Sequence, residues 1–228
     1  MDVGAARKFV EGSDDAIYEA LADAAVLVIA VTLAASGLAL LLVLASATDS
    51  FRVVAACAVY GASVFANFLI AALYHGFWRG PSKAVLQAAD HCSIFTLIAG
   101  TYTPIALLTL PQPLGWRLLA VMWGLAAFGI VARLWVGRMH WSLFGFLFAM
   151  GWMGMVWGAT MFAHLGADGG WLLLAGGFAY SGGLVFYLWR RAPFSDALWH
   201  LCVLAGAVCH FLTVSIYAIP YPAAPAAG

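Results

Sequence analysis

Seven long apolar segments, separated by short breaks, dominate this sequence. They cover about residues 24–46, 52–75, 90–110, 115–137, 141–163, 170–189 and 197–219. Each is close to the roughly 20 residues that a helix needs to cross about 30 Å of hydrocarbon. Because backbone polar groups in lipid must bond within their own segment, helices are expected rather than open strands. The pattern predicts an all-α, polytopic membrane protein built as a seven-transmembrane-helix bundle.

Composition supports this prediction and excludes one class of protein. Of 228 residues, 65% are hydrophobic and 9% are charged, whereas soluble domains have about 45–50% apolar and 25% charged residues. The net charge is zero and no basic stripe is present, which excludes a nucleic-acid-binding protein. We expect an N-terminal cytoplasmic segment over residues 1–23, a membrane domain over 24–219 and a C-terminal tail over 220–228.

The distribution of lysine and arginine gives the predicted bundle a direction. Eight of the ten cationic residues fall on one side of it, namely Arg7, Lys8, Arg79, Lys83, Arg133, Arg138, Arg190 and Arg191. Only Arg52 and Arg117 fall on the other side. Cytoplasmic loops of membrane proteins are enriched in Lys and Arg. The sequence therefore predicts a cytoplasmic N-terminus, a C-terminus outside, and a multi-pass location in the cell inner membrane.

This topology places five ionisable residues at one depth, near the cytoplasmic face. His75 ends the second predicted helix, Asp90 and His91 begin the third, and Asp196 and His200 begin the seventh. Ionisable groups within membrane spans are costly and are functional candidates by default. Asp196 and His200 are spaced i, i+4, so they share one helix face.

Two imidazoles and one carboxylate form a suitable ligand set for a metal such as zinc, which often keeps an open position for water in catalytic sites. A second carboxylate nearby is then placed to act as general base. Two other interpretations stay open: the histidines face the aqueous interface, or Asp90 and Asp196 are helix N-caps. His210 lies ten residues beyond His200, about 15 Å along a helix, and we expect it to be a hydrogen-bonded core histidine.

Several strings of residues resemble one known family. They are Leu73-Tyr74-His75, Asp90-His91, the run IAGTYTP from Ile98 to Pro104, the run from Leu198 to Gly206, and Cys209-His210-Phe211. Together they resemble the haemolysin III proteins, the bacterial branch of the progestin and adipoQ receptor family. The resemblance implies seven helices with the N-terminus inside. It also implies a zinc site held by His75 and His200, with Asp90 supporting an activated water.

Three positions depart from the family pattern. The family's last helix carries HxxxH, and its first histidine is Asp196 here; the hydroxyl residue expected four positions before His75 is Ala71. The helix-one motif, an acid or amide followed by a histidine, begins at Asp23 and has Leu27 in place of the histidine. We therefore predict His75, Asp196 and His200 as metal ligands, Asp90 as the catalytic base, and zinc as the cofactor, with its affinity lowered by these departures.

Three functions are compatible with these features. The first is a metal-dependent hydrolase of a lipid amide or ester, as related members and the more distant alkaline ceramidases imply. The second is a non-enzymatic membrane sensor or lipid-homeostasis protein. The third, a cytolysin, is disfavoured because no span carries a polar stripe suited to a channel. Membrane lipids are the expected partners.

Overall fold

The computed structural model describes residues 3–76, 82–189 and 191–220, which form helices and no strand. In chain order these are α1 (Val3–Ser46), α2 (Phe51–Gly76), α3 (Ser82–Thr109), α4 (Leu114–Val136), α5 (Trp141–Trp152), the short 3₁₀ helix η1 (Met153–Trp157), α6 (Gly158–Leu188), α7 (Ser195–Leu212) and the π-helical turn η2 (Thr213–Ala218). The all-α prediction is confirmed for this part of the chain.

Six segments of the described chain are long and apolar enough to cross a membrane, judged by length and composition. Five of them correspond to single predicted spans. The remaining one, Trp141–Leu188, has 48 residues and covers the ranges predicted as the fifth and sixth spans. This segment is not a continuous α-helix, because η1 interrupts it and Gly166 has φ 71° and ψ 173°. Such a backbone conformation strongly favours glycine.

Two helices begin earlier than hydropathy alone predicts. The third span was predicted from residue 90, but α3 begins at Ser82. Its first two turns contain Lys83 and Gln87, which contact the end of α2. The Lys83 ammonium donates to the Tyr74 carbonyl and lies 4.0 Å from the centre of the Tyr74 ring, while the Gln87 amide nitrogen donates to the Tyr74 hydroxyl at 3.0 Å. Likewise α1 begins at Val3 and continues without interruption to Ser46.

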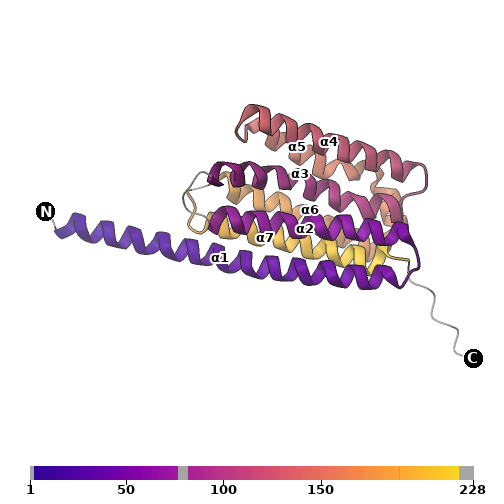
Figure 1. The fold of residues 1–228 in the computed structure, drawn as a ribbon, viewed down its shortest axis with the longest axis horizontal. Helices are drawn as coiled ribbons and strands as arrows, with labels where there is room; N and C mark the ends of the chain where they lie inside the picture. The colour runs from indigo at the N-terminus through magenta and orange to yellow at the C-terminus, as the bar shows by residue number, and fades with distance from the viewer. Residues whose placement is uncertain (1–2, 77–81, 190, 221–228) are drawn as a thin grey trace, which may run out of the picture.

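The helices form a bundle in which α3 is the most buried of the six candidate spans. It contacts α2 on one side and α4 on the other, while α1 contacts α2 and α7, and α6 packs along α7. Figure 1 shows α1 at one edge of the bundle and α4 with α5 at the opposite edge. The N-terminal part of α1 projects beyond the other helices (Figure 1).

The core is formed by aromatic and aliphatic side chains from all the α-helices, and its largest fully buried members include Tyr60, Phe68, Phe95 and Met122. Tyr102, within the IAGTYTP run, bridges to the break after α5: its hydroxyl donates to the Gly151 carbonyl at 2.8 Å and accepts from the Gly154 N–H at 2.6 Å. These bonds satisfy backbone groups that the helix interruption would leave unpaired in an apolar environment.

Large apolar side chains also cover the outer surface. Trp135, Val156 and Val28 are 89%, 75% and 65% exposed. A water-soluble protein rarely exposes contiguous apolar surface on this scale. The outward-facing side chains are therefore suited to contact with lipid.

Candidate metal centre

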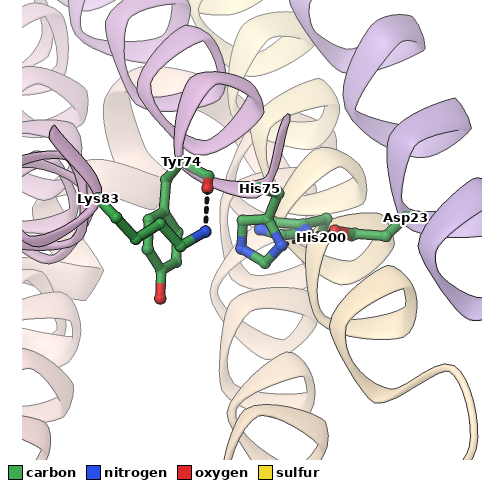
Figure 2. A network of polar contacts seen from close by, with 5 residues as sticks. All are labelled: Asp23, Tyr74, His75, Lys83 and His200. Carbon is green, nitrogen blue, oxygen red and sulfur yellow. Dashed lines mark hydrogen bonds and ion pairs between the residues drawn. The ribbon is translucent and has the colours of Figure 1, made fainter. Parts of the chain in front are cut away.

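Three side chains from three different helices converge at one end of the bundle. Asp23 lies on α1, His75 in the last turn of α2, and His200 in the second turn of α7. One Asp23 carboxylate oxygen, Oδ2, lies 2.7 Å from His75 Nδ1, and the other, Oδ1, lies 2.6 Å from His200 Nδ1. The two imidazole rings are nearly perpendicular, with centroids 4.9 Å apart. Figure 2 shows the three side chains pointing toward one another.

The cluster is largely withdrawn from the surface. The side chains of Asp23 and His200 are 8% and 5% exposed, whereas that of His75 is 24% exposed. A buried carboxylate requires hydrogen bonds or an opposite charge to offset the loss of water. Asp23 meets this need because each of its two oxygens contacts the imidazole of one histidine. The arrangement therefore holds three helices together through one carboxylate.

The local structure of α2 explains how His75 is held. The helix ends at Gly76, so its last carbonyl groups have no partner within the helix. Lys83, from the start of α3, donates to one of them, the carbonyl of Tyr74, as Figure 2 shows beside the cluster. A cation at a helix C-terminus also complements the helix dipole. The end of α2 is thus fixed next to the residue that contributes the imidazole.

Asp23, His75 and His200 offer one ligand atom each, and these atoms lie within 4.8 Å of one another. Two imidazole nitrogens and one carboxylate oxygen are the donors of many three-ligand catalytic zinc sites. They also suit other divalent first-row metals. The donor set and its convergence therefore fit a divalent metal, whose identity the geometry alone does not select.

The structure brings together two of the three ligands predicted from the sequence. His75 and His200 are in the cluster, and Asp23 contributes the carboxylate in the position that the sequence analysis gave to Asp196. Asp196 lies in the first turn of α7 and is partly exposed. It is close enough to His75 and Asp90 to interact with them electrostatically. Its assignment as a ligand stays a prediction.

Asp90, the predicted base, is placed beside the cluster. It interacts electrostatically with both histidines and with Asp23, and it lines a cavity together with His200. The alternative that Asp90 is a helix N-cap is wrong, because α3 begins at Ser82 and Asp90 lies two turns inside it. Its assignment as catalytic base stays a prediction.

The cavity has a volume of about 150 Å³ and lies between α2, α3, α5, α6 and α7. Most of its lining is apolar, contributed by residues such as Ile94, Leu147, Phe148 and Val203. Its polar lining residues include Asn67, Asp90, Ser181 and His200. An apolar cavity with a small number of polar groups is the usual form of a small-molecule site.

Asn67 is a polar residue of this cavity that the sequence analysis did not single out. It is 7% exposed, and its Oδ1 accepts a hydrogen bond of 2.9 Å from Ser93. The same Ser93 hydroxyl also lies 2.7 Å from the Asp90 carbonyl, so Asn67, Ser93 and the backbone of Asp90 form one connected polar group between α2 and α3. Asn67 lies eight residues before His75, on the same face of α2.

A second polar group is buried on the other side of α3. Arg133 and His91 are 3% and 7% exposed, and Arg133 Nε donates to His91 Nδ1 at 2.9 Å. The other ring nitrogen, Nε2, lies 3.3 Å from the Tyr187 hydroxyl. The arginine fixes the His91 tautomer because its Nε–H only donates, which makes Nδ1 the acceptor. His91 therefore belongs to this group and not to the cluster around Asp23.

Asp23 was overlooked because no spacing within one helix reveals it. The signal available was its position as the acid of the helix-one motif, at the start of an apolar run. An acid there requires a partner, but the partners lie 52 and 177 residues away along the chain.

These features define an all-helical membrane protein with a candidate metal centre at one end of the bundle, beside an apolar cavity. Residues 24–211 match the model of the family described as haemolysin-III related. The chain is 38% identical to hemolysin-3 of Bacillus cereus over 90% of its own length and 94% of the relative. It is 34% identical to the hemolysin-3 homolog of Bacillus subtilis, over 90% of this chain and 97% of that one.

A more distant human relative, the monocyte to macrophage differentiation factor, is 26% identical over 70% of this chain and 68% of its own. The match over most of the chain shows that the protein belongs to the haemolysin III family. His75 and His200 lie within the matched residues 24–211, and Asp23 directly precedes them.

Proposed function

We propose that the chain crosses the membrane seven times. The segment Trp141–Leu188 has 48 residues and as one straight helix would extend about 72 Å at 1.5 Å per residue. That length is more than twice the roughly 30 Å of the hydrocarbon core. The η1 interruption and the glycine conformation at Gly166 support a reversal of direction within this segment, which gives two crossings.

The proposed orientation has the N-terminus in the cytoplasm, the C-terminus outside, and the inner membrane as the location. With seven crossings, the end of α2 and the starts of α3 and α7 share one side, where Asp23 joins them. The same side carries the loops rich in Lys and Arg, as the positive-inside rule requires for a cytoplasmic face. A reporter that is active only in the cytoplasm, fused after Gly228, should be inactive; activity there would contradict this orientation.

The function we propose is metal-dependent hydrolysis of a lipid amide or ester at the cytoplasmic side. The observation that carries this proposal is the convergence of Asp23, His75 and His200 beside an apolar cavity. These three residues would hold the metal. A divalent metal in such a site supplies Lewis-acid activation of water and of a carbonyl group.

The remaining residues have separate tasks in this proposal. Asp90 lines the cavity and accepts a proton from the attacking water, as general bases of this type do. Asn67 also lines the cavity, and its side-chain amide would donate to the carbonyl oxygen of the substrate, where such a donor stabilises developing negative charge. The apolar wall of the cavity holds the acyl chain and excludes water from it.

Zinc is the metal that we propose, because two imidazoles and a carboxylate form a common zinc ligand set. Manganese and iron also bind carboxylate and imidazole, because these metals do not require a soft donor such as thiolate. Metal analysis of the purified protein should therefore give about one equivalent of a divalent metal. His200→Ala should remove it, and His164→Ala, which changes an exposed histidine, should retain it.

Hydrolysis is tested separately with Asp90→Asn. This variant should keep the metal and release fatty acid from ceramides or other N-acyl lipids at least about 100-fold more slowly than the wild type. A wild-type protein that binds metal and releases no fatty acid would contradict the enzymatic proposal. It would instead support a membrane sensor or lipid-homeostasis protein.

One observation favours that second candidate. Leu27 and Ala71, which replace polar residues of the family pattern, are 2% and 3% exposed. Each lies four residues from a cluster residue, Leu27 from Asp23 and Ala71 from His75. Apolar groups at these positions remove two polar contacts that would otherwise orient ligands, which suits a metal that stabilises structure better than one that turns over substrate.

A further inference from the structure

A second cavity adjoins the one described above. Its volume is about 80 Å³, and residues such as Ile105, Met161 and Leu173 line it. Six residues line both cavities: Thr101 and Tyr102 on α3, Gly151 and Trp152 on α5, Gly177 on α6 and His210 on α7. We refer to these six residues as the junction, because the two cavities share them as a common wall.

The spacing of lining residues along α6 gives the length of the two cavities together. Tyr187 and Leu184 line the first cavity, Gly177 lines both, and Leu173 lines the second. Their positions differ by three, seven and four residues, so they fall along one helix face. At 1.5 Å per residue, Gly177 lies about 15 Å from Tyr187, and Leu173 lies about 6 Å further on. The two cavities therefore extend over about 21 Å of α6.

Hydrogen bonds within the protein hold the side chains of the junction in place. The Trp152 indole N–H donates to the Ser181 hydroxyl at 3.0 Å, and this hydroxyl donates to the Gly177 carbonyl at 2.8 Å. His210 Nε2 lies 3.0 Å from the Leu173 carbonyl, which confirms His210 as a hydrogen-bonded core histidine. Trp152 is thus fixed against the turn of α6 that contains Gly177.

The hydroxyl groups of the junction also bond to the protein itself. The Thr101 hydroxyl donates to the Leu97 carbonyl at 2.8 Å. The Tyr102 hydroxyl donates to the Gly151 carbonyl and accepts from the Gly154 N–H. A hydrocarbon chain needs no hydrogen bond and is stabilised by contact with apolar surface. The junction is therefore better suited to methylene groups than to a polar part of a ligand.

Gly177 is the position at which a side chain would enter the junction. A Cβ atom added there would lie 3.6 Å from the Trp152 ring, which is an ordinary van der Waals contact. Alanine would therefore fit. A longer side chain would extend into the space between the two cavities or displace the Trp152 ring, because Trp152 lines both of them. The glycine thus keeps the junction open.

We propose that the acyl chain of a bound lipid passes the junction and ends in the second cavity, and that Gly177 determines how long a chain the site accepts. The inference rests on the proposed function in placing the polar end of the lipid at Asp90 and His200. One leaflet of a bilayer is about 15 Å thick, and long chains are disordered and shortened within it. An extended long chain therefore matches the two cavities together better than the first cavity alone.

The test is photolabelling of the full chain in lipid nanodiscs with decanamide and octadecanamide, each carrying a diazirine at its terminal carbon. Mass spectrometry of the peptides locates the label. In the wild type, octadecanamide should label Met161 or Leu173 in the second cavity, and decanamide should label Leu147 or Leu184 in the first. An excess of the unlabelled amide should remove both signals, which separates the cavities from the lipid-facing surface.

Gly177→Leu should lower octadecanamide labelling of the second cavity at least about fivefold, the smaller end of the cost of overpacking. Decanamide labelling of the first cavity should stay unchanged. Gly182→Leu is the matched control, because Gly182 lies on the same helix, is exposed, and has no atom within 4 Å of an added Cβ. Should Gly177→Leu not fold, the wild-type labelling pattern of the two amides carries the test.

Three results would overturn the proposal. They are octadecanamide labelling confined to the first cavity, the absence of labelling in either cavity, and undiminished labelling of the second cavity in folded Gly177→Leu. Failure of the proposed hydrolysis is distinguishable, because labelling requires binding alone. Asp90→Asn should show the wild-type labelling pattern, and this result would support the proposal even if the wild type hydrolysed no lipid.

Discussion

Replacing Asp23 by asparagine distinguishes the cluster seen in the structure from the ligand set predicted by sequence. The substitution preserves the size of the side chain and removes its charge. In the structure each carboxylate oxygen contacts a different imidazole, His75 through Oδ2 and His200 through Oδ1. An amide keeps only one acceptor oxygen, and its nitrogen donates. The change therefore removes a metal donor and disturbs the contact with one of the histidines.

The size of the effect follows from the number of donors. Loss of a group that merely orients a ligand typically costs 10- to 100-fold in metal affinity. Because Asp23 is one of the three donors that converge in the described part of the chain, its loss should reach at least about 100-fold, equivalent to about 2.7 kcal/mol. Asp196→Asn changes a partly exposed carboxylate whose atoms are outside the cluster, and it should change affinity less than about threefold.

The assay is competition for zinc between purified protein and a chromophoric chelator, with His164→Ala as the background control. Circular dichroism of each variant shows that its helices are retained. The opposite pattern, a large loss in Asp196→Asn and none in Asp23→Asn, would refute our reasoning and restore the ligand set of His75, Asp196 and His200. Equal small losses in both variants would show that neither carboxylate binds the metal.

Three further outcomes follow from the structure. Gly129→Ala should lower the free energy of unfolding by about 1–3 kcal/mol, because its Cβ would lie 2.3 Å from the Phe95 ring. Gly124→Ala on the same helix meets no atom within 4 Å and should leave this free energy unchanged. Unfolding in detergent measures both variants. Tyr102→Phe should cost about 2 kcal/mol, since two backbone groups at the α5–η1 junction lose their partner, and the exposed Tyr18→Phe should be neutral. Metal affinity should fall as the pH is lowered, because protons compete with the metal for the imidazole nitrogens; a pH-independent affinity in chelator titrations would exclude histidine ligands.

Hydropathy predicted the bounds of a helix well where the apolar run in the sequence ends at the same residues as the helix. The predicted spans 52–75 and 115–137 agree within one residue with α2 and α4, whose bounds are Phe51–Gly76 and Leu114–Val136. The start of α3 was missed because Lys83 and Gln87 make its first turns polar. These side chains are accommodated by the end of α2, a tertiary contact that no local pattern displays.

Arg133 is a second residue whose tertiary contact could not be predicted from the local sequence. The charge count placed it on the cytoplasmic side, near the end of the predicted span 115–137, and in the structure it is 3% exposed and donates to His91. A long side chain near a helix end is expected to reach the interface, and the acceptor on α3 holds it inside instead. The charge bias between the two sides would still be seven to two without it, so the orientation proposed here does not depend on this residue.

The sequence favoured Asp196 over Asp23 as the carboxylate ligand for a geometric reason. Asp196 and His200 share a face of α7, so spacing along one helix favoured that pair. The structure turns His200 Nδ1 toward α1, where Asp23 lies 2.6 Å away. Periodicity predicts which residues share a face, but it does not predict which neighbouring helix that face meets.

The bridging role of Asp23 also bears on the two apolar departures from the family pattern. Leu27 lies one turn after Asp23 on α1, and Ala71 lies one turn before His75 on α2, both buried. Neither side chain can hydrogen-bond to a ligand, so the orientation of the imidazoles must come from another group. Each oxygen of Asp23 contacts the Nδ1 atom of one histidine, so a member of the cluster itself orients both imidazoles. The geometry of this centre therefore depends on the packing of α1 against α2 and α7.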